Sequence, residues 1–243
     1  MSLLLASIIF KKTNAALVNN LVSLAVGTLL AASFLEIIPH AMEASNNNFH
    51  DISFTVLIGI LILFILEKLM IWRHCHGSHC HKHTECDTQS KQSKLSGNSG
   101  IIVIGDLFHN FVDGILIAAA FLANPAVGLL TAAAIIAHEI PQEIGNFMVM
   151  LNAGFSRARA LIYNLICGLL SVIGGVIGYF FLEQTMTIIP YLLVFASSSF
   201  IYIAVSDLMP QMHRRFQLRE SIRQISTILL GVLVVIGLSL LEH

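Results

Sequence analysis

Long apolar stretches, separated by short polar segments, make up most of this chain. Seven of them approach or exceed the roughly 20 residues that a transmembrane helix needs. They cover approximately residues 15–38, 53–72, 101–123, 126–151, 160–182, 188–209 and 225–241. The stretches are continuous and lack the two-residue alternation of a membrane β-strand. The pattern therefore predicts an all-α polytopic membrane protein with seven full transmembrane helices, built as one domain over residues 1–243.

The N-terminal segment 1–10 is also apolar but too short to cross a bilayer. It lacks the basic region and the cleavage site of a secretory signal peptide. We interpret this segment either as the stub of a further span or as a re-entrant start of the chain.

Composition agrees with a membrane protein, since 56% of the 243 residues are hydrophobic and only 11% are charged. Soluble proteins carry about 25% charged residues. Such hydrophobicity excludes intrinsic disorder. A net charge of −1 without a basic face argues against nucleic-acid binding. The lipid bilayer is the expected environment, with the plasma membrane as the expected location.

The 13 Lys and Arg residues fall in alternate connecting segments or at the adjoining helix ends. The basic segments are 11–14, 73–100, 152–159 and 210–224, whereas 43–52, 124–125 and 183–187 contain neither residue. Because basic loops stay in the cytoplasm, we expect the basic segments to be cytoplasmic and the C-terminus to lie outside.

Two spans end in a similar way. Glu36 precedes Pro39 by three residues, and Asp207 precedes Pro210 by three residues, 171 positions later in the chain. The first of these spans is expected to run outward and the second inward. An inverted repeat, common in transporters, would produce this pattern. Chance would also produce it, so both interpretations stay open.

The third and fourth spans carry polar residues near their centres. These are His109, Asn110 and Asp113 in the third span, and His138, Glu139, Gln142 and Glu143 in the fourth. An ionisable group at that depth costs at least ~2.5–3.5 kcal/mol. Residues 101–151 contain no Lys or Arg to offset these groups. A divalent cation would supply the missing positive charge, although hydrogen bonding between helices is the competing interpretation.

Helical spacing supports a metal site. His109 and Asp113 are four residues apart, as are His138 and Gln142, so each pair lies on one helix face. Asn110 and Glu139 follow one residue later, roughly 100° around the helix. A mixture of imidazole, carboxylate and amide ligands suits Zn²⁺, Fe²⁺ or Mn²⁺ better than Ca²⁺ or Mg²⁺.

The two motifs, HNFVDG from His109 to Gly114 and HEIPQE from His138 to Glu143, resemble the paired signatures of the ZIP metal permeases. They are most similar to the subfamily with HNFxDG and HExPHE motifs, and the resemblance covers essentially the whole chain. It implies eight spans with both termini outside. With the repeat suggested by the two span ends, we expect an inverted-repeat helix bundle. The resemblance also implies a transport site between the fourth and fifth spans, and the movement of Zn²⁺ and related ions into the cytosol.

The resemblance further implies roles for individual residues. A primary metal site would contain His109, Asp113, His138 and Gln142. Asn110 and Glu139 would line an adjacent second site that Asp113 bridges. Independently of the resemblance, we expect Glu143 to support Gln142 and His138. This sequence departs from the subfamily at Gln142, where an amide replaces the usual imidazole, so affinity and ion selectivity are in doubt. It also departs at the short first segment.

The predicted cytoplasmic loop 73–100 carries five His and three Cys between residues 73 and 87. Such tracts are typical of metal binding. We expect a labile site that collects or senses cytosolic metal, and a simple polar linker is the alternative.

Together these features predict a divalent-metal permease, with zinc as the main substrate and iron or manganese as others. It would not be an enzyme and would need no cofactor beyond the transported ion. Its partners would be that ion and the bilayer, with a homodimer left open. The alternative is an intramembrane zinc metalloprotease, since His138 and Glu139 begin an H-E-x-x-H motif, but Gln142 stands where that motif needs its second His.

Overall fold

The computed structural model describes residues 15–45, 48–76, 88–212 and 218–240, and every regular element in these ranges is helical. The elements are α2 (Ala15–Ala31), η2 (Ala32–Ile37), α3 (Ile38–Ala44), α4 (Phe49–His76), α5 (Thr88–Ala123), α6 (Pro125–Asn152), α7 (Arg157–Leu182), η3 (Met186–Ile188), α8 (Ile189–Tyr202), η4 (Ile203–Leu208), α9 (Met209–Met212) and α10 (Leu218–Leu240). The predicted stub, residues 1–10, lies outside the described residues.

Six helical stretches of the described chain are long and apolar enough to cross a membrane, which confirms an all-α polytopic membrane protein. They are Leu17–Ala44, Phe49–Leu69, Gly105–Ala123, Arg157–Leu182, Met186–Met212 and Leu218–Leu240. The seventh predicted span corresponds to α6, which has 28 residues but is not among the six. The polar side chains of its second half lower its mean hydropathy. These side chains need not face lipid, because α6 packs against α2, α5 and α7.

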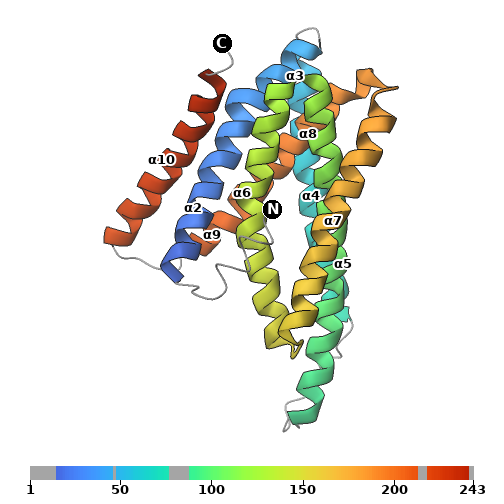
Figure 1. Ribbon diagram of the computed structural model, residues 1–243, viewed down its shortest axis with the longest axis vertical. Helices are drawn as coiled ribbons and strands as arrows, with labels where there is room; N and C mark the ends of the chain where they lie inside the picture. Colours follow the sequence, from blue (N-terminus) through green and yellow to red (C-terminus); the bar gives the residue numbers. More distant parts are fainter. Residues whose placement is uncertain (1–14, 46–47, 77–87, 213–217, 241–243) are drawn as a thin grey trace.

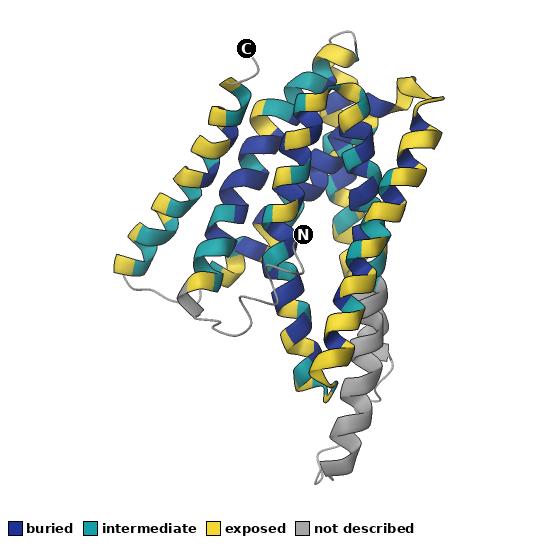
Figure 2. Cartoon of the chain, in the orientation of Figure 1, coloured by how far each residue is buried: buried dark blue, intermediate teal, exposed yellow. Residues whose placement is uncertain are grey.

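The most extensive helix contacts join α5 to α7, α2 to α10, α5 to α6 and α4 to α8 (Figure 1). The outward faces of α7 and α10 are largely exposed (Figure 2), and so is that of α4. All three carry exposed apolar side chains such as Phe64, Phe180 and Leu233. These faces suit contact with lipid. The largest buried cluster lies where α2, η2, α6 and α8 meet, and it includes Leu29, Ile37, Ile135, Leu193 and Phe200.

The two similar span ends share a local geometry. η2 and η4 are π-helical, and each is followed by a proline, Pro39 or Pro210, at the second position of the next helix. Proline has no N–H and clashes with the carbonyl four residues earlier, which favours a wider turn. α2 and α8 run in opposite directions in Figure 1, as an inverted repeat requires. Glu36 and Asp207 occupy equivalent positions within the two π turns.

Contacts with neighbouring helices follow the same symmetry. Gly27 of α2 lies against the backbone of Ile228 in α10, and its repeat counterpart Ser198 of α8 lies against Gly59 in α4. In the repeat, α2 therefore corresponds to α8 and α10 corresponds to α4.

The connection predicted at 73–100 is shorter than the sequence pattern suggested. α4 continues to His76 and α5 begins at Thr88, so only residues 77–87 separate the two helices. The polar segment before residue 101 contains Gln, Lys and Leu, which are good helix formers, and it extends a helix already formed downstream. Most of the His/Cys tract falls in residues 77–87, outside the described residues.

The bundle has an inner and an outer end. The inner end carries α9, the start of α10 and the turn between α6 and α7, and the outer end carries α3, the turn between α5 and α6, and η3 (Figure 1). The described Arg157, Arg159, Arg219 and Arg223 all lie in the first two turns of α7 or α10, at the inner end.

Candidate metal site

Close backbone contact holds α5 in place against α7. A Cβ atom on Gly114 would collide with the carbonyl oxygen of Ser171, and one on Gly174 would collide with that of Phe111. Glycine at these positions lets the two backbones touch, as small residues do in membrane helix pairs. Gly114 directly follows Asp113, so this contact fixes the height and rotation of the helix that carries the first polar group.

Four side chains from α5 and α6 converge between the two helices. One ligand atom from each of His109, Asp113, His138 and Glu139 lies within 4.8 Å of the others. Oδ2 of Asp113 is 3.5 Å from Nε2 of His109 and 3.5 Å from Nε2 of His138. Oε1 of Glu139 is 4.0 Å from Nε2 of His109. Asp113 is therefore central, with an imidazole from each helix beside it.

The facing atoms of this four-residue cluster are buried and have no hydrogen-bond partner among the described residues. They are Nε2 of His109, Oδ2 of Asp113, Nε2 of His138 and Oε1 of Glu139. Leaving a buried polar atom without a hydrogen bond costs ~1–3 kcal/mol, and more for a charged group. Four such atoms directed at one point would be costly unless that point receives a positively charged ligand.

Charge leads to the same conclusion. No Lys or Arg in the described part of the chain forms an ion pair with either carboxylate. When ionised, Asp113 and Glu139 bring two negative charges to the cluster, and one divalent cation would balance them.

His138 is oriented for coordination. Its side chain is fully buried, and Nδ1 lies 3.1 Å from the backbone oxygen of Ala134. Because a carbonyl oxygen only accepts, Nδ1 carries the proton and donates it. In its neutral form the ring would then present an unprotonated Nε2 to the cluster, the arrangement usual for a metal-binding histidine.

The spacing of the cluster fits a transition metal. Two Zn²⁺ ligands at ~2.0–2.1 Å in a tetrahedral arrangement lie about 3.3 Å apart. The two 3.5 Å separations around Asp113 are close to that value, whereas the 4.0 Å separation to Glu139 is wider. A small inward shift of Glu139, or a larger coordination number, would complete the site.

The other predicted site residues lie beside this cluster. Gln142 donates from Nε2 to Oδ1 of Asp106 over 3.1 Å, and Asn110 donates from Nδ2 to the backbone oxygen of Asp106, also over 3.1 Å. Glu143 is buried, and its backbone oxygen accepts a hydrogen bond of 3.2 Å from Asn164 of α7. The structure thus places a carboxylate oxygen of Glu139 among the four ligand atoms, and it joins the amide nitrogen of Gln142 to Asp106.

Asp106 is not a residue that the two motifs single out. It is largely buried and receives both amide side chains. Its signal in the sequence is spacing, because it precedes His109 by three residues and Asp113 by seven and so shares their helix face.

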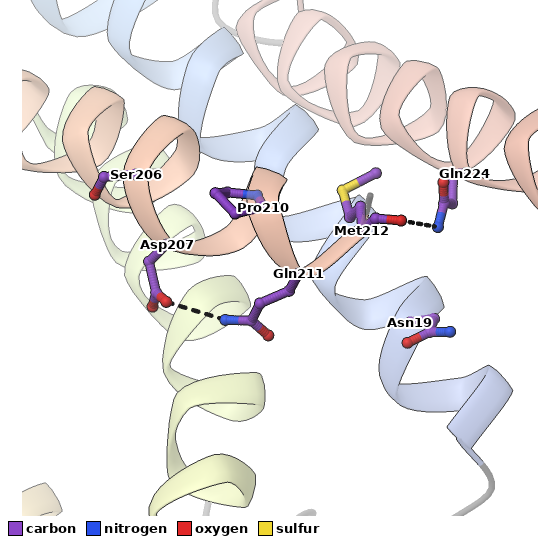
Figure 3. Close-up of a pocket in the computed structure, with 7 residues that line it drawn as sticks. All are labelled: Asn19, Ser206, Asp207, Pro210, Gln211, Met212 and Gln224. Atoms are coloured by element: carbon purple, nitrogen blue, oxygen red, sulfur yellow. Dashed lines mark hydrogen bonds between the residues drawn. The ribbon is translucent and has the colours of Figure 1, made fainter. Parts of the chain in front are cut away.

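Two adjoining cavities, together called the inner cleft, extend from His109 of the cluster toward the inner end. One cavity of about 580 Å³ reaches His109; it is lined by Glu67, His109, Gln142, Asn146, Tyr202, Ile203, Ser206 and Asp207. A second, of about 510 Å³, is lined by Asn19, Ser206, Asp207, Pro210, Gln211, Met212 and Gln224 (Figure 3). The two cavities share Ser206 and Asp207. In the second cavity, Gln211 donates to Asp207 over 3.0 Å.

The outer side of the cluster is closed. One turn outward from His138, Ala134 and Ile135 are buried and pack into the same apolar cluster as Ile37 of η2 and Leu193 of α8. The site is therefore accessible from the inner end and sealed by apolar packing toward the outer end.

Comparison with known proteins is consistent with this arrangement. A family model described as ZIP zinc transporter matches residues 1–239. The chain is 38% identical over 152 residues to zinc transporter foi of Drosophila melanogaster, covering 63% of this chain and 21% of foi. It is 30% identical over 173 residues to human zinc transporter ZIP10, covering 71% and 20%. It is 30% identical over 241 residues to zinc transporter ZIP13 of Pongo abelii, covering 90% and 66%. The chain thus spans about a fifth of the length of foi and ZIP10.

Proposed function

The chain belongs to the ZIP zinc transporter family, and on this basis we propose that it carries a divalent transition metal, above all zinc, across a membrane into the cytosol. The observation that supports this best is the set of four buried ligand atoms, on two helices, that face one another without hydrogen-bond partners. Two imidazoles and two carboxylates form a ligand set suited to zinc, and also to iron or manganese.

Binding at this site would follow from ligand exchange. Asp113 and Glu139 attract the cation and balance its charge, while the nitrogen atoms of His109 and His138 replace water molecules from its hydration shell. His138 needs no reorientation, because Ala134 already holds its ring in the coordinating tautomer. Of the four groups, His109 alone also lines the cleft, so it is the last ligand that a departing ion meets.

The cleft supports release toward the inner end. Beyond His109 it presents Asp207 and other polar side chains, which can hold a cation weakly on its way out. Transport requires such weak successive contacts, since an ion that binds too tightly does not leave. The cleft opens at the end of the bundle that carries the basic residues, which the positive-inside rule assigns to the cytoplasm. The direction that this supports is import.

A second metal position beside the first remains part of the proposal. Asn110 and Gln142 both lie next to the main cluster and both donate to Asp106. Turning either amide would present its oxygen to an ion shared with Glu139. Such a position would be weaker than the main one, because amide oxygens are neutral.

The competing protease interpretation has no support from the relatives, which are named as transporters. In a zinc protease of the H-E-x-x-H type the glutamate acts as a base and is not a ligand. Here Oε1 of Glu139 lies among the four ligand atoms. We therefore do not propose an enzymatic activity.

An uptake assay in proteoliposomes tests the transport function. The purified chain should move Zn²⁺ down a gradient, and a panel including Fe²⁺ and Mn²⁺ would rank the substrates. His138→Ala should abolish uptake, whereas Glu183→Gln, at an exposed position of the outer end, should not change it. A wild-type chain that inserts correctly and moves none of these ions would disprove the proposal.

A further inference from the structure

Two buried hydroxyl groups on the outer side of the metal cluster have no hydrogen-bond partner. Oγ1 of Thr131 and Oγ of Ser197 belong to fully buried residues and are unpaired among the described residues. Their neighbours behave differently: Thr28 donates to Ala25 over 3.0 Å and Ser198 donates to Val194 over 2.8 Å. A helical Ser or Thr can normally bond to a carbonyl of the preceding turn. That these two do not is a local exception.

Both hydroxyl groups lie between the cluster and the outer end. Thr131 precedes His138 by seven residues, so it is two turns outward on the same face of α6. Ser197 precedes Phe200 by three residues, and the ring of Phe200 is 5.9 Å from that of His138. α6 and α8 both run from the outer to the inner end (Figure 1), so both hydroxyl groups lie nearer the outer end than the metal cluster does.

The π-helical segment η2 connects the two positions. It contacts both α6 and α8, and its Ser33 donates to the backbone oxygen of Ser197 over 3.4 Å. η2, α6 and α8 together form the apolar plug that closes the outer side. An unpaired hydroxyl group inside this plug raises the free energy of the closed structure. On burial it loses its hydrogen bonds to water and forms none with the protein.

The inverted repeat relates η2 to η4, which lines the inner cleft. Asp207 of η4 lines the inner cleft, and its repeat-related residue is Glu36 of η2. Glu36 is partly exposed and lies three residues beyond Ser33 toward the outer end. If one π turn borders the inner route, symmetry places the other at the border of an outer one.

We propose that the outer half of the metal route passes between η2, α6 and α8, along the hydroxyl groups of Ser33, Thr131 and Ser197, with Glu36 at its mouth. This inference rests on the proposed transport function. In the structure this route is closed. When η2 moves away, the hydroxyl groups gain water or a cation as partners, and this gain favours opening.

Isosteric variants test the role of the hydroxyl groups. Thr131→Val and Ser197→Ala remove an unpaired hydroxyl and should stabilise the closed plug, so zinc uptake should fall by up to about tenfold per site. Zinc affinity in detergent should stay within about twofold, since zinc reaches the cluster from the inner cleft, and thermal stability should stay equal or rise. The matched controls Thr28→Val and Ser198→Ala remove paired hydroxyls. They should lower stability and leave the uptake rate per folded molecule unchanged.

Labelling from outside supplies a second measurement. In intact cells, Thr131→Cys and Ser197→Cys should react with a membrane-impermeant maleimide above the background of the parent chain, and Ser198→Cys should not. Equal uptake by the two variants and their controls, or no labelling above background, would overturn the inference while transport by the parent chain stands. A parent chain that moves no zinc would instead overturn the proposed function.

Discussion

Gln142 of α6 donates a hydrogen bond from its side-chain amide nitrogen to Oδ1 of Asp106 in α5, 3.1 Å away. Helical spacing places Gln142 one turn from His138, on the face that meets α5. The carboxylate of Asp106 offers the amide a charged acceptor, and hydrogen bonds to charged groups are the stronger ones. The pair thus links α6 to α5 directly beside the metal site and at the edge of the cleft.

We predict that Gln142→His will tighten zinc binding and shift preference toward Zn²⁺ over Mn²⁺. An imidazole supplies a nitrogen ligand that zinc binds well, whereas the amide offers only a neutral oxygen. Tighter binding need not speed transport, because the ion must also leave. We expect a lower half-saturating zinc concentration with an equal or lower maximal rate, measured by uptake in proteoliposomes.

Gln142→Ala is the control for that change. It removes the amide without adding a ligand, so it should not raise zinc affinity. If both variants leave zinc affinity and the zinc-to-manganese ratio unchanged, Gln142 acts only as a partner of Asp106.

Asp113→Asn should have the largest effect on metal binding. Asp113 contacts both imidazoles, and the amide keeps its shape while removing its charge. Loss of a direct ligand should exceed the ~10–100-fold loss typical of outer-shell partners. The rise in melting temperature that zinc causes in the wild type should disappear, because that stabilisation depends on affinity.

Asp51→Asn provides the comparison, since Asp51 is exposed at the outer end. It should keep the full zinc-dependent rise in melting temperature. A zinc response in Asp113→Asn as large as that of Asp51→Asn would remove Asp113 from the ligand set.

Variants of Glu139 and Asn110 distinguish the ligand arrangement indicated by the structure from the one implied by the motifs. The motifs put both residues in a secondary position, but Glu139 lies 4.0 Å from His109 within the main cluster. We therefore expect Glu139→Gln to weaken the high-affinity zinc site strongly, and Asn110→Ala to weaken only a second, low-affinity step. Isothermal titration calorimetry distinguishes the two steps, and equal losses in both variants would favour the arrangement implied by the motifs.

Gly114→Ala should destabilise the protein by forcing α5 away from α7. The added methyl would collide with the carbonyl oxygen of Ser171, and overpacking of this kind costs ~1–3 kcal/mol. Zinc affinity should fall with stability, since Asp113 moves with the helix. Thermal unfolding in detergent measures the effect.

Gly237→Ala in α10 is the matched change, because an added Cβ there meets nothing within 4 Å. It should be neutral or slightly stabilising, since alanine favours a helix. Equal stability of the two variants would show that the α5–α7 contact tolerates separation.

The sequence by itself determined the features that depend on neighbouring residues along the chain. Long apolar runs need lipid or a core around them, so they specify helices and most of the spans. The four-residue spacing of His109 and Asp113 places both on one helix face, and their side chains are 3.5 Å apart in the structure. The prolines after Glu36 and Asp207 likewise act on the turns that precede them, and both turns are π-helical.

Only the tertiary structure decided which side chains face one another between α5 and α6. The rotation of α6 against α5 brings Glu139 into the cluster, and the Gln142 amide finds its partner, Asp106, on the other helix. The polar cleft and the closed outer plug likewise depend on α2 and α8, which are distant in sequence from both motifs. Spacing along a helix fixes which residues share a face, but not which face meets a neighbour. That choice is made by packing among all the helices at once.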